Sequence, residues 1–201
     1  MTLIGLDFDN TLVCYDRLFH KTALERGLID NSIPPDKVAI RNYLRKENRD
    51  EDFTLLQGEV YGLKILEAEP ANGMLEALME LNKLQIPMVL VSHKTKTPYR
   101  GPRYDLHESA INWLNKYGFF SRKGLAWSRD QVFFESTKTE KIERIKSLGC
   151  THYIDDLEEI LEALPASIKK IHYTSQARSK GISKDIVSMA NWNADTIVNL
   201  K

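Results

Sequence analysis

The sequence contains two cysteines, Cys14 and Cys150, which are too few for the disulfide network of a small secreted domain. It has no apolar run approaching the ~20 residues that span a bilayer, no internal repeat and no Gly/Ser-rich linker. There is no charge excess, because 28 basic side chains balance 28 acidic ones, which disfavours binding to a nucleic-acid backbone. The N-terminus lacks the basic region of a secretory signal. We therefore expect a cytoplasmic protein with neither nucleic acid nor a membrane as its partner.

The length of 201 residues fits one domain, or one domain with a small insertion. Continuous apolar runs predict buried parallel strands at residues 2–8, 86–92, 131–135 and 151–155, with a weaker candidate at 170–174. Helical patterns alternate with them at residues 72–84, 106–117, 137–148 and 157–164. A helix and an irregular end are expected in the tail, residues 182–201. The expected fold class is α/β, a Rossmann-like parallel sheet with helices on both faces.

The chain between the first predicted strand and residue 72 interrupts this alternation, because it is far longer than the usual connection of ~4–6 residues. It contains no convincing strand, and its pattern predicts helices at 16–26, 35–47 and 51–67. Gly27 follows the first of these helices and Pro34-Pro35 begins the second, as is typical of helix ends and starts. We therefore predict an α/β core of residues 1–14 and 70–201 and a helical cap insertion of residues 15–69. An insertion at this point would lie over the carboxyl ends of the strands, where open α/β sheets bind ligands.

Two predicted strands end in pairs of acidic residues. In the segment GLDFDNTLV, Asp7 and Asp9 are two residues apart and point the same way. Like charges so close favour a cation beside them, and a site of few oxygen ligands completed by water and phosphate suits Mg²⁺. A polar turn is the alternative reading. The segment THYIDDLEE repeats the pattern with Asp155 and Asp156, although Asp156 alone could cap the following helix. One metal bridging both strand ends explains both pairs.

Two further segments place a hydroxyl and a cation at comparable positions. Ser92 ends the second predicted strand, where a hydroxyl with backbone N–H groups can hold a phosphoryl oxygen, although a lone serine is often only a cap. In the segment STKTEK, Lys138 or Lys141 stands at the start of a predicted helix. A cation there opposes the helix dipole and indicates an anion nearby, but either lysine could also be solvated surface. The residues leave the choice between the two lysines open.

Taken together, these four segments resemble the haloacid dehalogenase-like superfamily of phosphohydrolases. The resemblance extends from residue 3 to about residue 160, with the segments in the right order and each at a strand end or helix start. The segments DFDNT and YIDD are the most specific for the superfamily. The segments with Ser92 and with the two lysines are specific only because they stand at the expected positions relative to those two. The helical insertion lies between the first and second motifs, where phosphatases of this superfamily carry a helical cap.

The resemblance implies a Mg²⁺-dependent phosphatase that acts on a small phosphorylated metabolite, either a sugar phosphate or a nucleotide. Asp7 would be the nucleophile that forms an aspartyl-phosphate, and Asp9 would be the general acid and base. The metal would be bound by Asp7, by the backbone carbonyl of Asp9, by Asp156 and by Asp155 as an assisting acid. Ser92 and either Lys138 or Lys141 would hold the phosphoryl oxygens. The hydroxyl of Thr11 would stabilise the loop that follows the first strand.

The segment from His93 to Tyr104 is the most individual part of the sequence, with four lysine or arginine side chains and no acidic one. It is either a solvated loop or a second contact for the substrate, with His93, Arg100 and Arg103 as candidate substrate-binding residues. Two alternative functions are a phosphomutase of the same superfamily and a catalytically silent binding or regulatory protein. We expect a monomer or a homodimer.

Overall fold

The computed structural model describes residues 2–174 and 185–199. The chain divides into two compact units. The sheet unit consists of Met1–Val13, Pro70–Lys94 and Tyr117–Lys201, and the helical unit consists of Cys14–Glu69 and Thr95–Lys116. No helix among the described residues is long and apolar enough to cross a membrane.

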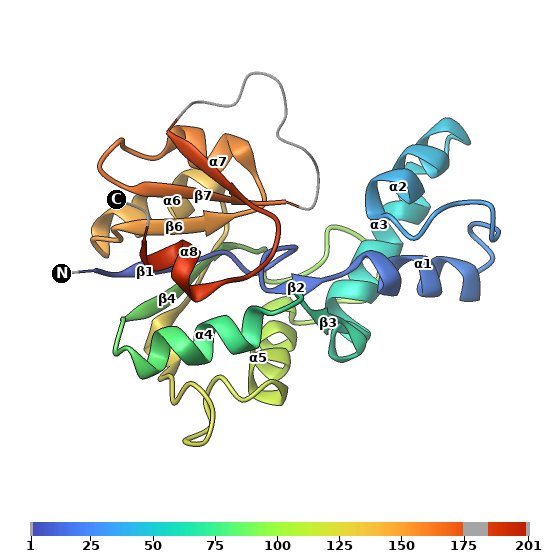
Figure 1. The fold of residues 1–201 in the computed structure, drawn as a ribbon. Helices are drawn as coiled ribbons and strands as arrows, with labels where there is room; N and C mark the ends of the chain where they lie inside the picture. The colour runs from blue at the N-terminus through green and yellow to red at the C-terminus, as the bar shows by residue number, and fades with distance from the viewer. Residues whose placement is uncertain (1, 175–184, 200–201) are drawn as a thin grey trace. The chain divides into compact units, whose positions relative to one another are not determined.

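A six-stranded parallel sheet forms the centre of the sheet unit, in the order β5-β4-β1-β6-β7-β8 (Figure 1). Its strands are β1 (Ile4–Leu6), β4 (Met88–His93), β5 (Val132–Glu135), β6 (His152–Asp155), β7 (Lys169–Tyr173) and β8 (Ile186–Met189). The predicted α/β class is confirmed, and all five predicted strands are present. β1 has β4 on one side and β6 on the other, so the strand order reverses at β1, where doubly wound sheets bind ligands.

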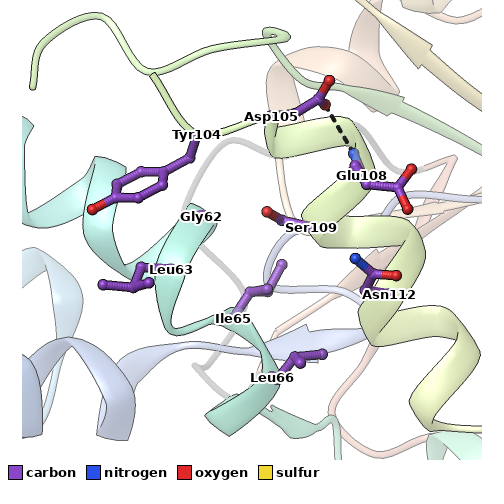
Figure 2. A pocket seen from close by; sticks show the side chains of 9 residues that line it. All are labelled: Gly62, Leu63, Ile65, Leu66, Tyr104, Asp105, Glu108, Ser109 and Asn112. Atoms are coloured by element: carbon purple, nitrogen blue, oxygen red, sulfur yellow. Dashed lines mark hydrogen bonds between the residues drawn. The ribbon is translucent and has the colours of Figure 1, made fainter. Parts of the chain in front are cut away.

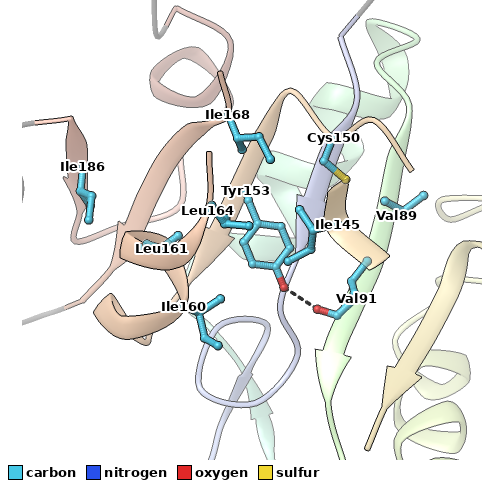
Figure 3. Close-up of a cluster of buried hydrophobic side chains, with 10 residues drawn as sticks. All are labelled: Val89, Val91, Ile145, Cys150, Tyr153, Ile160, Leu161, Leu164, Ile168 and Ile186. Atoms are coloured by element: carbon cyan, nitrogen blue, oxygen red, sulfur yellow. Dashed lines mark hydrogen bonds between the residues drawn. The ribbon is translucent and has the colours of Figure 1, made fainter. Parts of the chain in front are cut away.

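Helices and a buried apolar cluster support this sheet. The helices of the unit are α4 (Met74–Lys83), α6 (Lys138–Ser147), α7 (Glu158–Ala163), α8 (Ala194–Val198) and the short 3-10 helix η3 (Arg129–Gln131). Figure 3 shows the ring of Tyr153 among side chains from α6, α7 and β4, with its hydroxyl donating a hydrogen bond to the carbonyl of Val91. α6 begins with a capping box between Thr137 and Glu140. The start of α6 is therefore well defined next to the sheet.

The tail differs from the sequence-based expectation. Ile186–Met189 forms the sixth strand, parallel to β7, where a helix and an irregular end were predicted, and α8 is the one helix in the part of the tail that the structure describes. The sequence of β8 is Ile-Val-Ser-Met, so Ser188 interrupts its apolar residues and no long apolar run marks this edge strand. Its first and last residues are buried and the two between them are exposed. Residues 182–184 and 200–201 of that prediction lie outside the described residues.

The helical unit contains the three helical segments predicted for the insertion. Its helices are α1 (Asp16–Glu25), α2 (Lys37–Lys46), α3 (Asp50–Gly58), the π-helix η1 (Glu59–Leu63), the 3-10 helix η2 (Ile65–Glu67) and α5 (Leu106–Lys116). α2 begins where the carboxylate of Asp36 accepts a hydrogen bond of 2.6 Å from the backbone N–H of Ala39. β2 (Val13–Cys14) and β3 (Glu69–Pro70) form a separate two-stranded sheet.

One boundary differs from the prediction. The predicted core range 70–201 includes Thr95–Lys116, which the structure places in the helical unit. α5 belongs there because the indole of buried Trp113 donates a hydrogen bond of 2.9 Å to the carbonyl of Ala68, at the end of η2. The periodicity of residues 106–117 predicts a helix with an apolar face, but a periodicity does not say which neighbour covers that face.

β1 passes so close to the Tyr153 ring that only glycine fits at position 5. A Cβ atom on Gly5 would lie 2.6 Å from Cδ2 of Tyr153 and 3.0 Å from Sγ of Cys150. We expect Gly5→Ala to lower the free energy of unfolding by about 1–3 kcal/mol, measured by urea denaturation. The exposed control Glu162→Ala should stay within about 0.5 kcal/mol of the wild type. A Gly5→Ala variant as stable as the wild type would contradict this packing.

Candidate active site

Polar side chains from three neighbouring strands meet at the carboxyl edge of the parallel sheet. Asp7 directly follows β1, Ser92 lies on β4 and Asp155 ends β6. Because these strands are parallel neighbours, their carboxyl ends share one edge of the sheet. α6 adds a fourth side chain, that of Lys141, from its first turn. The edge therefore gathers four of the predicted site residues from distant parts of the sequence.

Asp7 is the centre of this cluster. Its Oδ1 accepts hydrogen bonds from the Ser92 hydroxyl at 2.8 Å and from the Lys141 ammonium at 2.6 Å. Its Oδ2 lies 3.5 Å from the Thr11 hydroxyl, at the limit of hydrogen-bond distance. All four side chains are buried. A buried carboxylate needs such donors because water is not there to solvate it.

Lys141 is shared between two buried carboxylates. Its ammonium lies 2.6 Å from Oδ1 of Asp7 and 2.6 Å from Oδ2 of Asp155. Burial by itself would lower the pKa of Lys141, but the charges of Asp7 and Asp155 outweigh burial and raise the pKa. Burial and the charge of Asp7 raise the pKa of Asp155 to about 7, against the opposing effect of Lys141. Burial and the charge of Asp7 therefore work against ionisation of Asp155, and a cation bound beside it would favour its carboxylate form.

The two candidate lysines occupy different environments. Lys141 is buried in the cluster, whereas Lys138 is exposed and forms an ion pair with Glu159. Lys141 stands one helical turn before buried Ile145, on the side of α6 that faces the sheet. Only Lys141 of the two contacts Asp7 among the described residues. In the sequence both lysines stand four residues before an isoleucine, Lys138 before Ile142 and Lys141 before Ile145, so spacing alone does not separate them.

A buried lysine that sequence reasoning did not select contacts the second aspartate of the first motif. The ammonium of Lys94 donates to both carboxylate oxygens of Asp9, each at 2.9 Å, and Lys94 is 4% exposed. Its ammonium also lies 5.2 Å from the centre of the Phe8 ring. The sequence signal was its position two residues after Ser92, at the end of the same strand.

Three carboxylates of the cluster could hold a metal ion. Oxygen atoms of Asp7, Asp155 and Asp156 all lie within 4.8 Å of one another. Asp156 is oriented by the side-chain amide of Asn10, which donates to its Oδ2 at 3.3 Å. An all-oxygen donor set of this kind suits a hard divalent cation such as Mg²⁺. The residues present therefore fit a Mg²⁺ site.

The loop that follows β1 carries Asp9, Asn10 and Thr11. It is stabilised by a hydrogen bond within the loop and by a contact from the tail. The backbone N–H of Leu12 donates to the carbonyl of Phe8 at 3.0 Å, which closes a tight turn. Asn10 has a positive φ of 58°, a conformation that asparagine tolerates better than most residues. The indole of Trp192, in the tail, donates to the carbonyl of Thr11 at 3.2 Å. No motif in the tail indicated that contact.

The other predicted substrate-binding residues are His93, in the sheet unit, and Arg100 and Arg103, in the helical unit. His93 follows Ser92, and its Nε2 is 3.1 Å from the carbonyl of Ser136. Arg100 and Arg103 are exposed residues of the helical unit. Arg100 already has a carboxylate partner, because its guanidinium lies 2.6 Å from Glu51 of the same unit. Substrate contacts by these three residues stay a prediction.

A hollow of about 370 Å³ lies within the helical unit and differs from the cluster in chemistry (Figure 2). Its apolar lining includes Leu63 and Leu66, and its polar lining includes Asp105 and Glu108. Figure 2 shows the carboxylate of Asp105 turned to the first turn of α5, where it accepts from the backbone N–H of Glu108 at 2.9 Å. Two acidic side chains without a basic one make this hollow unsuited to a phosphate group.

No family model and no curated protein matches the sequence. Solved structures match nearly the whole chain. A HAD-superfamily hydrolase of subfamily IA from Geobacter sulfurreducens has a TM-score of 0.57 at 10% identity, covering 100% of this chain and 97% of that one. A family IA HAD hydrolase from Entamoeba histolytica has a TM-score of 0.56 at 15% identity, covering 99% and 100%. A haloacid dehalogenase-like family hydrolase from Xanthomonas campestris has a TM-score of 0.54 at 10% identity, covering 98% and 93%.

Proposed function

We propose, from the haloacid dehalogenase-like fold that this chain has, that it is a Mg²⁺-dependent phosphatase that hydrolyses a small phosphorylated metabolite through an aspartyl-phosphate. The observation that carries the proposal is the set of hydrogen bonds around Asp7. A carboxylate at the carboxyl edge of β1 is contacted by a hydroxyl and an ammonium, and two further carboxylates lie close enough to share a metal. Such an arrangement suits a nucleophile that must approach an anionic phosphate ester.

Asp7 is the nucleophile in this proposal. One of its oxygens forms a bond to phosphorus while the bond from phosphorus to the leaving oxygen breaks, which splits hydrolysis into two easier steps. Ser92 and Lys141 already donate to Asp7, so their hydroxyl and ammonium are in place for the phosphoryl oxygens next to it. Donors fixed before the reaction stabilise the charge that develops in the transition state without rearranging.

Asp9 is the general acid and base. It would give a proton to the leaving oxygen in the first step and take a proton from the attacking water in the second. The carboxylate of Asp9 is partly exposed, with 23% of its side chain accessible, so it can reach both substrate and water. A carboxylic acid here suits phosphoryl transfer, because displacement of a halide from carbon does not need it.

The metal would be held by Asp7, Asp155 and Asp156, with the backbone carbonyl of Asp9 as a further ligand. When bound, Mg²⁺ supplies positive charge that lets an anionic nucleophile approach an anionic ester. Asp7 and Asp155 share the ammonium of Lys141, and oxygen atoms of Asp7, Asp155 and Asp156 lie close together. This grouping of carboxylates also supports the choice of a divalent cation.

The test is phosphate release from p-nitrophenyl phosphate with and without Mg²⁺. We expect turnover with Mg²⁺, its loss after treatment with EDTA and its return when Mg²⁺ is added in excess. A screen of sugar phosphates and nucleotides would then identify the metabolite. Turnover that EDTA leaves unchanged would remove the metal from the proposal. No phosphate release from any substrate would favour a silent binding or regulatory protein, and transfer to a sugar hydroxyl would favour a phosphomutase.

A further inference from the structure

Lys94 and Asp9 form an ion pair whose geometry is unusually restricted. The ammonium lies 2.9 Å from each of the two carboxylate oxygens of Asp9, so it fixes the plane of the carboxylate as well as its position. The lysine itself has little freedom, because its side chain is 3% exposed. Its backbone N–H donates to the carbonyl of Glu135, at the end of β5, at 2.9 Å. The orientation of Asp9 is therefore set by a buried side chain anchored on two strands.

The two buried lysines of the site serve different aspartates. Lys141 contacts Asp7 and Asp155, whereas Lys94 contacts Asp9 through both of its oxygens. The ammonium of Lys94 lies over the Phe8 ring, 5.2 Å from the ring centre, and the lysine side chain is 3% exposed. An ammonium removed from water in this way is retained at a considerable free-energy cost unless it is paired. Its pairing with Asp9 places this ammonium at the side chain that is proposed as the general acid and base.

We propose that Lys94 is a positioning residue that orients Asp9 for proton transfer to the leaving oxygen, an inference that rests on the proposed phosphatase function. In the first step an Asp7 oxygen bonds to phosphorus and the bond to the leaving oxygen breaks. The leaving oxygen takes the proton of Asp9, which becomes a carboxylate. The Lys94 ammonium keeps its own proton and pairs with the charge that Asp9 acquires. Lys94 thus acts on the chemistry only through Asp9.

This role predicts a dependence on the leaving group. p-Nitrophenolate is a weak base that departs with little help from an acid, whereas phenolate is a stronger base that needs the proton more. Loss of Lys94 should therefore impair phenyl phosphate much more than p-nitrophenyl phosphate, although the two substrates have nearly the same shape. A lysine that only supported the fold, or that held the phosphoryl group common to both substrates, would affect both equally.

The experiment compares kcat/KM for the two substrates in Mg²⁺ for the wild type and Lys94→Met. We expect a loss of about 10²-fold for phenyl phosphate and of less than about fivefold for p-nitrophenyl phosphate. Lys94→Arg keeps the charge and should recover part of the loss on phenyl phosphate. The matched control Lys146→Met removes an exposed lysine of α6 and should leave both values unchanged. Equal losses on the two substrates in Lys94→Met would overturn the inference.

A double-mutant cycle tests whether Lys94 acts through Asp9 and remains informative if Lys94→Met folds poorly. Asp9→Asn combined with Lys94→Met replaces both charges of the pair, so no unpaired ion remains. On phenyl phosphate we expect the double variant to match Asp9→Asn within about twofold. A further loss equal to that of Lys94→Met alone would mean that Lys94 acts independently of Asp9. Failure of the phosphatase proposal is recognised separately, because the wild type would then hydrolyse neither substrate.

Discussion

Replacing Asp7 with asparagine is expected to remove phosphate release almost completely while the chain stays folded. The amide has the shape of the carboxylate but cannot act as the nucleophile, so kcat on p-nitrophenyl phosphate should fall by at least about 10³-fold. Asp7 is buried, yet its loss leaves no lysine unpaired, because Lys141 keeps its contact with Asp155 at 2.6 Å. Removing one of two carboxylates that share one ammonium also relieves their mutual repulsion.

The measurement pairs kcat in Mg²⁺ with thermal unfolding of the same samples. Asp130→Asn is the matched control, since it makes the same substitution at an exposed aspartate of the sheet unit and should change neither quantity. Asp7→Asn should unfold at nearly the wild-type temperature. If this variant retained about a tenth of the wild-type kcat, the covalent mechanism assigned to Asp7 would be wrong.

The second large effect is expected at Lys141. Its ammonium is the shared partner of Asp7 and Asp155, so Lys141→Met leaves two buried carboxylates facing each other. Breaking a buried ion pair in this way should lower the free energy of unfolding by about 3–5 kcal/mol. Because the ammonium is also proposed to hold a phosphoryl oxygen, kcat should fall by about 10²- to 10³-fold.

Lys138→Met is the matched control for Lys141→Met, because it makes the same substitution at the other candidate lysine. Lys138 lies on the same helix, but it is exposed and pairs with Glu159 on the surface, where an ion pair contributes about 0–1 kcal/mol. Urea denaturation and phosphate release should therefore be close to wild type for Lys138→Met and strongly reduced for Lys141→Met. Similar effects of the two substitutions would place the phosphoryl contact elsewhere.

The sequence predicted those parts of the fold and site that depend on local order. Continuous apolar runs predict buried parallel strands because both faces of such strands are covered. All five predicted strands are present in the sheet. The positions of Asp7, Ser92 and Asp155 at one sheet edge follow from the same argument, since each stands where a predicted strand ends. The helical insertion was also predictable, because a long segment with helical periodicity has few other structures available to it.

Several features depended on partners that a linear pattern does not name. β8 is a short edge strand with two exposed central residues, and its pairing with β7 is a long-range contact that no local pattern of apolar residues indicates. α5 was predicted as a helix, but its assignment to the helical unit rests on contacts such as that of Trp113 with Ala68. Both features depend on contacts between residues far apart in sequence, so the periodicity within each element could not predict them.

The sequence by itself therefore determined the class of fold, the strand ends that carry the acidic residues and the chemistry those residues suit. Tertiary structure alone decided which lysine serves which carboxylate: Lys141 contacts Asp7 and Asp155, Lys94 contacts Asp9, and Lys138 lies on the surface. The physical reason is that a lysine side chain is long and is charged in either setting. Whether its ammonium is buried against a carboxylate or exposed to water depends on the elements packed around it, and these come from distant parts of the chain.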